Sequence, residues 1–333
     1  MNALIVAEKG RLEIVDIPQP VTGPYDALVR MEVCGICNST DIKLIDGEMY
    51  WAPPFPFILG HESVGVVIER GKKVRNFKIG DRVTRPTAYF PGNTGKLNVA
   101  NGGFAELGIV RDGRAMAADG DNSLIDDYHV NRQLVVPGHL TPLDASLSIS
   151  LSETASTLNH LPAVKGKKIL VAGAGVVGLS FALWVKLAGG LVIVLDRRRH
   201  SLEMAEKMGA DEVVNSENLN FLDRIEEASL GKLDGIIEAT GDVSLAETLL
   251  NVLKPDGFAC AYGVPPKAIS YSNRWIPAIV EEQKNYYRIA DLVLQNLIKT
   301  EWFITNTWSF EQIVEAFNSV RKGIVLKGFI QFT

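Results

Sequence analysis

The stretch ILVAGAGVVGLSFALWVKLAGGLVIVLD, residues 169–196, decides the fold of the second half of the chain. An apolar run at 169–171 leads into a glycine-rich turn, an apolar segment follows at 176–187, and a second apolar run at 191–195 ends at Asp196. Strands buried on both faces are continuously apolar, and a helix joins two of them when they are parallel. The stretch therefore predicts one βαβ unit.

The same alternation continues along the chain. Helices are predicted at 201–208, 222–230 and 245–253, and strands at 212–214, 235–239 and 258–262. Two amphipathic helices, at 289–298 and 310–320, and a strand at 328–332 follow. The residues at 254–257, Lys-Pro-Asp-Gly, are typical of a turn. Alternation of this kind predicts a doubly wound parallel sheet.

The first 138 residues have a different pattern. Short β-rich runs at 27–33, 63–69 and 82–84 are separated by Gly, Pro and Asp, as in an irregular all-β domain. A chain of 333 residues with 47% hydrophobic side chains can bury a core in each of two domains. The predicted fold class is thus α/β plus β.

The charge balance excludes some classes of partner. The chain has 34 Lys and Arg residues and 39 Asp and Glu residues, so its composition does not indicate a polybasic surface that binds nucleic acid. No apolar run of about 18 residues predicts a membrane span, and no signal peptide is evident. We expect a cytoplasmic protein that acts on a small molecule. Three cysteines also argue against a disulfide framework.

The glycine-rich turn has the pattern G-x-G-x-x-G between a predicted strand and a predicted helix. Gly173 allows a tight turn, Gly175 lets a pyrophosphate approach the backbone, and Gly178 packs the helix against the strand. Val176 and Val177 stand at the helix N-terminus, which attracts the phosphate charge. These residues predict a dinucleotide site.

Asp196 follows the first glycine by 23 residues (196 − 173), close to the spacing of an acid that binds the cofactor ribose. Its carboxylate would repel a 2′-phosphate, which favours NAD over NADP. Arg197, Arg198 and Arg199 come next and could pair with a 2′-phosphate instead, so NADP stays open.

A second group of residues could hold a metal. Cys34 and Cys37 form a C-x-x-C pair, His61 and Glu62 follow a glycine, and Glu153 comes later. The pair alone would suggest a structural zinc or a redox site, but there is no second pair and no preceding βαβ start. One Cys, one His and one or two carboxylates match a catalytic zinc with an open position.

Several motifs occur in one order along the chain: Cys37 with Asp41, GHESVGVV at 60–67, GDRV at 80–83, GGFAE at 102–106, the glycine-rich turn, GAD at 209–211 and GV at 263–264. Over nearly its whole length the chain resembles the zinc-dependent medium-chain alcohol and polyol dehydrogenases. The resemblance implies a GroES-like catalytic zinc domain at 1–152, a Rossmann NAD-binding domain at 153–284, and a tail at 285–333 that returns to the first domain. It also implies a homodimer or homotetramer.

The resemblance assigns roles to particular residues. Cys37 and His61 are expected to ligate zinc, and Glu62 to approach the metal or to support its ligands. Glu153 stands where the sorbitol, threonine and glucose dehydrogenases carry a glutamate ligand. Further cofactor contacts are expected at Thr240, Gly263 and Val264.

Three departures from the family pattern matter. Residues 88–101 contain no cysteine, so we expect one catalytic zinc per subunit and no structural zinc. Two residues, Asn38 and Ser39, stand before Thr40, so either Ser39 or Thr40 could relay the substrate proton. Lys43 replaces a frequent relay histidine.

The chemistry expected is hydride transfer between a secondary alcohol and a nicotinamide cofactor, with zinc lowering the pKa of the alcohol. Polyols, sugars, cyclitols and hydroxy-amino acids are candidate substrates. The alternatives are a zinc-free quinone or enone reductase on the same fold, and a catalytically idle NAD-binding regulatory protein.

Overall fold

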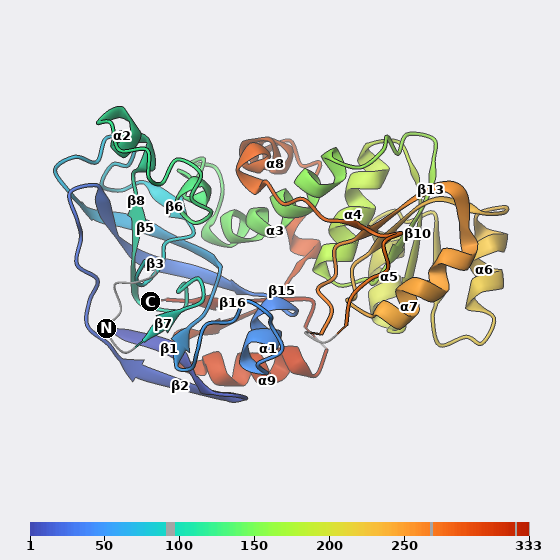
Figure 1. Cartoon of the computed structure of the whole chain (residues 1–333), viewed down its shortest axis with the longest axis horizontal. Helices are drawn as coiled ribbons and strands as arrows, with labels where there is room; N and C mark the ends of the chain where they lie inside the picture. The colour runs from blue at the N-terminus through green and yellow to red at the C-terminus, as the bar shows by residue number, and fades with distance from the viewer. Residues whose placement is uncertain (91–96, 267–268, 324, 333) are drawn as a thin grey trace. The chain divides into compact units, whose positions relative to one another are not determined.

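A computed structural model describes residues 1–90, 97–266, 269–323 and 325–332. The chain forms two compact units (Figure 1). The first unit comprises Met1–Ser150 and Tyr286–Thr333, and the second comprises Leu151–Asn285. In the described parts of the chain, no helix is both long and apolar enough to cross a membrane.

The first unit is built on two β-sheets. One sheet has the order β2-β1-β4-β7, with strands Arg11–Asp16, Asn2–Glu8, Phe57–Ile58 and Asn98–Val99. The other has the order β15-β16-β3-β5-β6, with strands Ile304–Ser309, Lys327–Gln331, Asp26–Ile36, Glu62–Arg70 and Arg82–Thr84. A further strand, β8 (Leu107–Arg111), pairs with β3. Alternating apolar residues such as Val29, Val67 and Val110 form the core beneath the second sheet.

The end of the chain belongs to this unit. Strand β16 pairs antiparallel with β3, Gly328 opposite Ile36, so the last strand lies beside one of the first (Figure 1). Helices α8 (Tyr286–Leu294) and α9 (Ile313–Arg321) precede it. On α9, Phe317 packs its ring edge-on against Phe104 with 5.6 Å between centroids. Residue 327 therefore lies next to the end of β3, almost 300 positions earlier.

The second unit is one parallel sheet with helices α4, α5, α6 and α7 around it (Figure 1). The strand order is β11-β10-β9-β12-β13-β14, formed by Glu212–Asn215, Leu191–Asp196, Lys168–Ala172, Leu233–Glu238, Leu253–Ala261 and Ile276–Pro277. The helices are Val176–Leu187, Arg199–Lys207, Phe221–Ala228 and Val243–Leu249. The predicted fold class, a β domain with a doubly wound parallel sheet, is confirmed.

The strand order reverses beside β9. The chain moves from β9 outward to β10 and β11, and then returns to β12 on the other side of β9. Ligands of doubly wound sheets bind at such a switch point, outside the carboxyl ends of the strands. The glycine-rich turn follows β9 at that edge.

Some predicted boundaries differ from the structure. The helix predicted to reach residue 253 ends at Leu249 and continues as a 3₁₀ turn, Leu250–Val252. The predicted turn at 254–257 lies inside β13, where Leu253 pairs with Leu233 and Phe258 with Gly235. The tetrapeptide therefore bulges out of a strand instead of ending a helix, because the pairing resumes on both sides of it. Helices α1 (Thr40–Ile45) and α3 (Pro142–Asn159) were not predicted.

Candidate metal and cofactor sites

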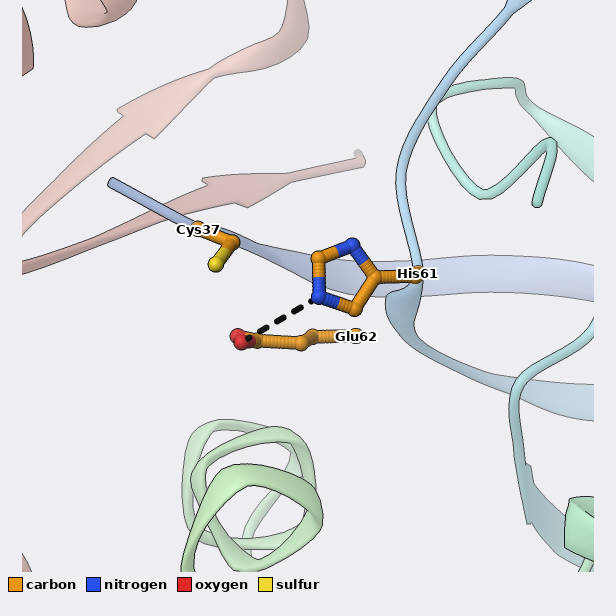
Figure 2. Close-up of side chains that lie close together, drawn as sticks. All are labelled: Cys37, His61 and Glu62. Carbon is orange, nitrogen blue, oxygen red and sulfur yellow. Dashed lines mark ion pairs between the residues drawn. The ribbon is translucent and has the colours of Figure 1, made fainter. Parts of the chain in front are cut away.

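Cys37, His61 and Glu62 converge in the first unit (Figure 2). One potential ligand atom from each, the thiol sulfur, an imidazole nitrogen and a carboxylate oxygen, lies within 4.8 Å of the others. The three meet because β3 and β5 are antiparallel, with Gly35 opposite Glu62. Gly60 sets the approach of His61: its φ is +104°, and a Cβ there would lie 2.7 Å from the Phe104 nitrogen.

Asp41 contacts the backbone of Cys37 and the side chain of His61. It is fully buried at the start of α1. Its Oδ2 accepts a hydrogen bond of 2.9 Å from the backbone N–H of Cys37, and its Oδ1 lies 3.4 Å from Nδ1 of His61. Carboxylates in this position orient a metal-binding imidazole, so that the other ring nitrogen faces the metal. Here that nitrogen, Nε2, lies 3.8 Å from Oε1 of Glu62.

The charges in the cluster favour a thiolate. Burial alone would raise the pKa of the Cys37 thiol, but the neighbouring His61 side chain lowers it. Burial would lower the pKa of His61, but Asp41 and Cys37 raise it well above its ordinary value. A thiolate is the form of cysteine that binds metals. The sulfur, nitrogen and oxygen donors together suit Zn²⁺, so these residues fit the metal expected from the sequence.

Glu62 is neutralised by a lysine that the sequence analysis missed. Lys327, the first residue of β16, forms an ion pair with Oε2 of Glu62, while Ser150 donates a 2.7 Å hydrogen bond to Oε1. Both charged side chains are almost fully buried. Burial alone would raise the pKa of Glu62, but Lys327 lowers it. Lys327 has no local sequence signal, because only the pairing of β16 with β3 brings it to the site.

Glu153 lies on α3, in the second unit, and is half-buried. Its backbone carbonyl accepts hydrogen bonds from Ser156 and Thr157, of 2.7 and 3.2 Å. Its role as a zinc ligand stays a prediction. Of the other thiols, Cys34 and Cys260 are fully buried, and burial raises the pKa of Cys260 to about 12.

The residues proposed for proton transfer lie at the start of α1, next to Cys37. Ser39 precedes the helix, Thr40 begins it, and Lys43 follows one turn later, all three half-buried. The backbone N–H of Thr40 lies 3.4 Å from the sulfur of Cys37. The structure thus places these residues beside the cluster, and their roles stay predictions.

A small hollow opens beside His61 in the first unit. Every lining side chain carries a polar group; they are His61, Ser63, Arg85, Thr87, Asn101, Tyr128, His129 and Arg132. His129 belongs to none of the sequence motifs, so only the structure reveals that it lies beside His61.

The glycine-rich turn has the geometry expected of a dinucleotide site. Gly173 has a φ of +101°, which favours glycine. A Cβ on Gly178 would lie 1.7 Å from the carbonyl oxygen of Gly173, so no side chain fits there. A Cβ on Gly175 would meet nothing within 4 Å, and this residue caps α4, where Val176 and Val177 follow. The backbone is therefore open to a ligand at Gly175.

Asp196 ends β10 and turns towards this loop. Its Oδ2 accepts a 2.7 Å hydrogen bond from the N–H of Ala174, and its Oδ1 accepts bonds of 2.8 and 3.1 Å from the backbone and side chain of Arg198. Burial alone would raise the pKa of Asp196, but these bonds lower it. Arg197 is exposed, and Arg199 pairs with Glu203 at 3.2 Å.

Thr240 and the pair Gly263-Val264 follow the neighbouring strands β12 and β13. Thr240 touches the glycine-rich turn, because its Cγ2 would lie 2.9 Å from a Cβ on Gly173. Gly263 and Val264 are half-buried. Residues from three strand ends therefore meet at one edge of the parallel sheet.

Comparison with known proteins agrees with this arrangement. The family described as "Alcohol dehydrogenase GroES-like domain" matches residues 23–119, and "Zinc-binding dehydrogenase" matches residues 176–286. An alcohol dehydrogenase from Cupriavidus necator is 31% identical over 79% of this chain and 76% of its own length. L-threonine 3-dehydrogenase from Serratia proteamaculans is 27% identical over 97% of both chains.

A solved structure extends the similarity to the fold. The alcohol dehydrogenase TADH from Thermus sp. ATN1 superimposes with a TM-score of 0.83 at 22% identity, covering 100% of both chains. The family resemblance and the enzyme class predicted from the sequence are confirmed. The chain belongs to the zinc-type medium-chain alcohol dehydrogenase family, and it is a zinc-dependent oxidoreductase of hydroxyl groups that uses a nicotinamide cofactor.

Proposed function

We propose that the enzyme interconverts a secondary alcohol of a polar small molecule and the corresponding ketone, using NAD and one zinc ion per subunit. The observation that carries this proposal is the cluster of Cys37, His61 and Glu62, with Asp41 behind it. A zinc-free reductase would not need these side chains together, and the intact set of metal donors argues against a catalytically idle NAD-binding protein.

Cys37 and His61 would hold the zinc, with Glu153 or Glu62 as the third protein ligand. Bound zinc supplies Lewis-acid chemistry, which lowers the pKa of an alcohol in the open position. Asp41 keeps the imidazole oriented, and the N–H of Thr40 near the sulfur stabilises the thiolate. Lys327 and Ser150 hold Glu62, which competes with Glu153 for the role of third ligand.

The substrate proton would leave through a hydroxyl at the start of α1. Thr40 is our first choice, because its own backbone already contacts Cys37, and Ser39 is the alternative. Lys43, one turn along the same helix, would then help to pass the proton from that hydroxyl towards solvent. Positioned proton transfer of this kind contributes roughly 10²- to 10⁴-fold to a rate.

The preference for NAD is supported by Asp196, whose carboxylate stands at the end of β10 next to the glycine-rich turn. Gly173, Gly175 and Gly178 would carry the pyrophosphate at the N-terminus of α4. Arg198 is engaged by Asp196, which leaves the exposed Arg197 and Arg199 as cations that would meet a 2′-phosphate.

The nature of the hollow beside His61 supports a polar substrate, such as a polyol, sugar, cyclitol or hydroxy-amino acid. The side chains that line it carry hydroxyl, amide, imidazole and guanidinium groups, which can form hydrogen bonds to such a substrate. We further propose a cytoplasmic enzyme that works as a homodimer or homotetramer.

The test combines metal analysis with turnover. We expect one zinc per chain, and reduction of NAD by members of a polyol, sugar and hydroxy-amino acid panel but not by simple alkanols of similar size. Glu153→Ala should lower zinc content and abolish turnover, whereas its neighbour Ser152→Ala serves as the control. Retained zinc and activity in Glu153→Ala would transfer the ligand role to Glu62 or to water, and a zinc-free active protein would overturn the proposal.

A further inference from the structure

We propose that Glu238 is a positioning residue: its buried carboxylate holds the turns after β12 and β13 in the shape that receives the nicotinamide half of the cofactor. This inference rests on the proposed cofactor site in the second unit. Nothing in the sequence pattern assigns a function to Glu238, which ends β12 and is fully buried.

The Glu238 carboxylate ties two segments together. Its Oε1 accepts a 2.9 Å hydrogen bond from the N–H of Gly241 and further bonds from the N–H and the hydroxyl of Thr240. Its Oε2 accepts a hydrogen bond from the hydroxyl of Tyr271, which also lies 2.9 Å from the carbonyl oxygen of Gly263. One side chain therefore joins the turn after β12 to the segment around Tyr271.

The backbone of the same residue holds the turn after β13. Its carbonyl oxygen accepts hydrogen bonds of 2.9 Å from the N–H groups of both Tyr262 and Gly263. The fit is close, because a Cβ on Gly263 would lie 2.2 Å from the nitrogen of Gly241 and 2.5 Å from Oε2 of Glu238. The two turns thus pack directly on each other around Glu238.

The position of these turns identifies the part of the cofactor that they serve. Asp196 and the glycine-rich turn lie on the β9–β10 side of the switch point, where a doubly wound fold binds the first mononucleotide. The second mononucleotide lies across the switch point, on the side of β12 and β13. Thr240 lies where the two mononucleotide sites adjoin, since its methyl group contacts Gly173 in the glycine-rich turn. The turns held by Glu238 therefore face the nicotinamide half.

The buried carboxylate of Glu238 depends on its hydrogen bonds, because burying an ionisable group costs free energy unless hydrogen bonds compensate. Within the described part of the chain its donors are neutral groups, two backbone N–H groups and two hydroxyls. A hydroxyl accepts as well as donates, so glutamine would keep the arrangement: its NH₂ would donate to Tyr271, whose hydroxyl would donate to the carbonyl oxygen of Gly263. Methionine has about the same length but no oxygen acceptor, so the N–H groups of Thr240 and Gly241 would lose their partner. Glu238→Met is therefore the change that breaks the arrangement.

The experiment measures two affinities for each purified variant by calorimetric titration: ADP, which reports the adenine half alone, and NADH or NADPH, whichever binds the wild-type enzyme more tightly. We expect Glu238→Met to weaken binding of the full cofactor by about tenfold or more, as for unsatisfied buried donors, and to leave the affinity for ADP within about twofold. The matched control is Glu247→Met, because the hydrogen bonds that Glu247 accepts, of 3.1 and 3.0 Å, come from Ser272, next to Tyr271, and from neither turn. It should change neither affinity.

Equal losses of ADP and full-cofactor affinity would mean that Glu238 only maintains the fold, and an unchanged cofactor affinity would also overturn the inference. If Glu238→Met does not fold, Tyr271→Phe removes one donor and keeps the ring in the core. It should weaken binding of the full cofactor by about threefold with the affinity for ADP unchanged, and no change would refute the proposal. A wild-type protein that binds ADP but neither NADH nor NADPH would instead overturn the proposed function.

Discussion

Replacing Lys327 by methionine tests how strongly the last strand is coupled to the metal cluster. The ion pair between Lys327 and Glu62 has side-chain exposures of 3% and 2%, so solvent screens it little. The substitution keeps an unbranched side chain only one atom shorter and leaves Glu62 buried with Ser150 as a remaining hydrogen-bond donor. Removing one partner of a buried pair costs about 3–5 kcal/mol, because the other charge is left uncompensated. We expect the free energy of unfolding of the first unit to fall by at least about 3 kcal/mol.

The assay is urea-induced unfolding of the metal-free protein, with the change in free energy taken from the midpoint at a common slope. The double variant Glu62→Gln/Lys327→Met should regain most of the loss, since a neutral amide replaces the stranded carboxylate. Lys322→Met, at an exposed lysine after α9, is the control and should stay within about 0.5 kcal/mol of wild type. A loss below about 1 kcal/mol for Lys327→Met, or a double variant no more stable than the single one, would refute the reasoning.

Three further predictions concern other parts of the chain. In the zinc-free protein, iodoacetamide at pH 7.5 should modify Cys37, whose pKa is lowered by His61, and spare the buried Cys34 and Cys260. Peptide mapping identifies the modified cysteine, and added zinc should suppress the reaction. Modification of Cys260 before Cys37 would contradict the prediction. Asp112 caps α2 (Gly113–Ala118) and accepts four hydrogen bonds, and although burial alone would raise its pKa, the bonds from Asn76, Arg75 and Ala115 lower it. Its carboxylate therefore stabilises the fold above the ordinary pKa of about 3.9, so Asp112→Asn should cost about 2 kcal/mol at pH 7, and the difference should shrink as the pH falls below about 4; a difference independent of pH would contradict this. Asp196→Ala should reduce the preference for NAD over NADP by about tenfold or more in kcat/KM, because it removes the repulsive carboxylate and releases Arg198; a wild-type enzyme that already prefers NADP would show that the arginines dominate.

Local patterns in the sequence determine much of this protein. Continuous apolar runs and glycine spacing identify the parallel sheet and its dinucleotide turn, because buried strands and a tight phosphate-binding loop restrict residue type position by position. The cluster is also partly visible, since Cys37, His61 and Glu62 lie within motifs whose spacing is set by two paired strands.

Other features depend on contacts between segments that are distant in the sequence. Lys327 reaches Glu62 only through the pairing of β16 with β3, and Asp41 supports His61 only because α1 turns back after Cys37. Glu238 looks like an ordinary strand residue until the turns after β12 and β13 close around it. Periodicity records which face of an element is buried, but not which charge or donor lies opposite. The counter-charges and hydrogen-bond partners of the buried acids are therefore decided by the tertiary structure alone.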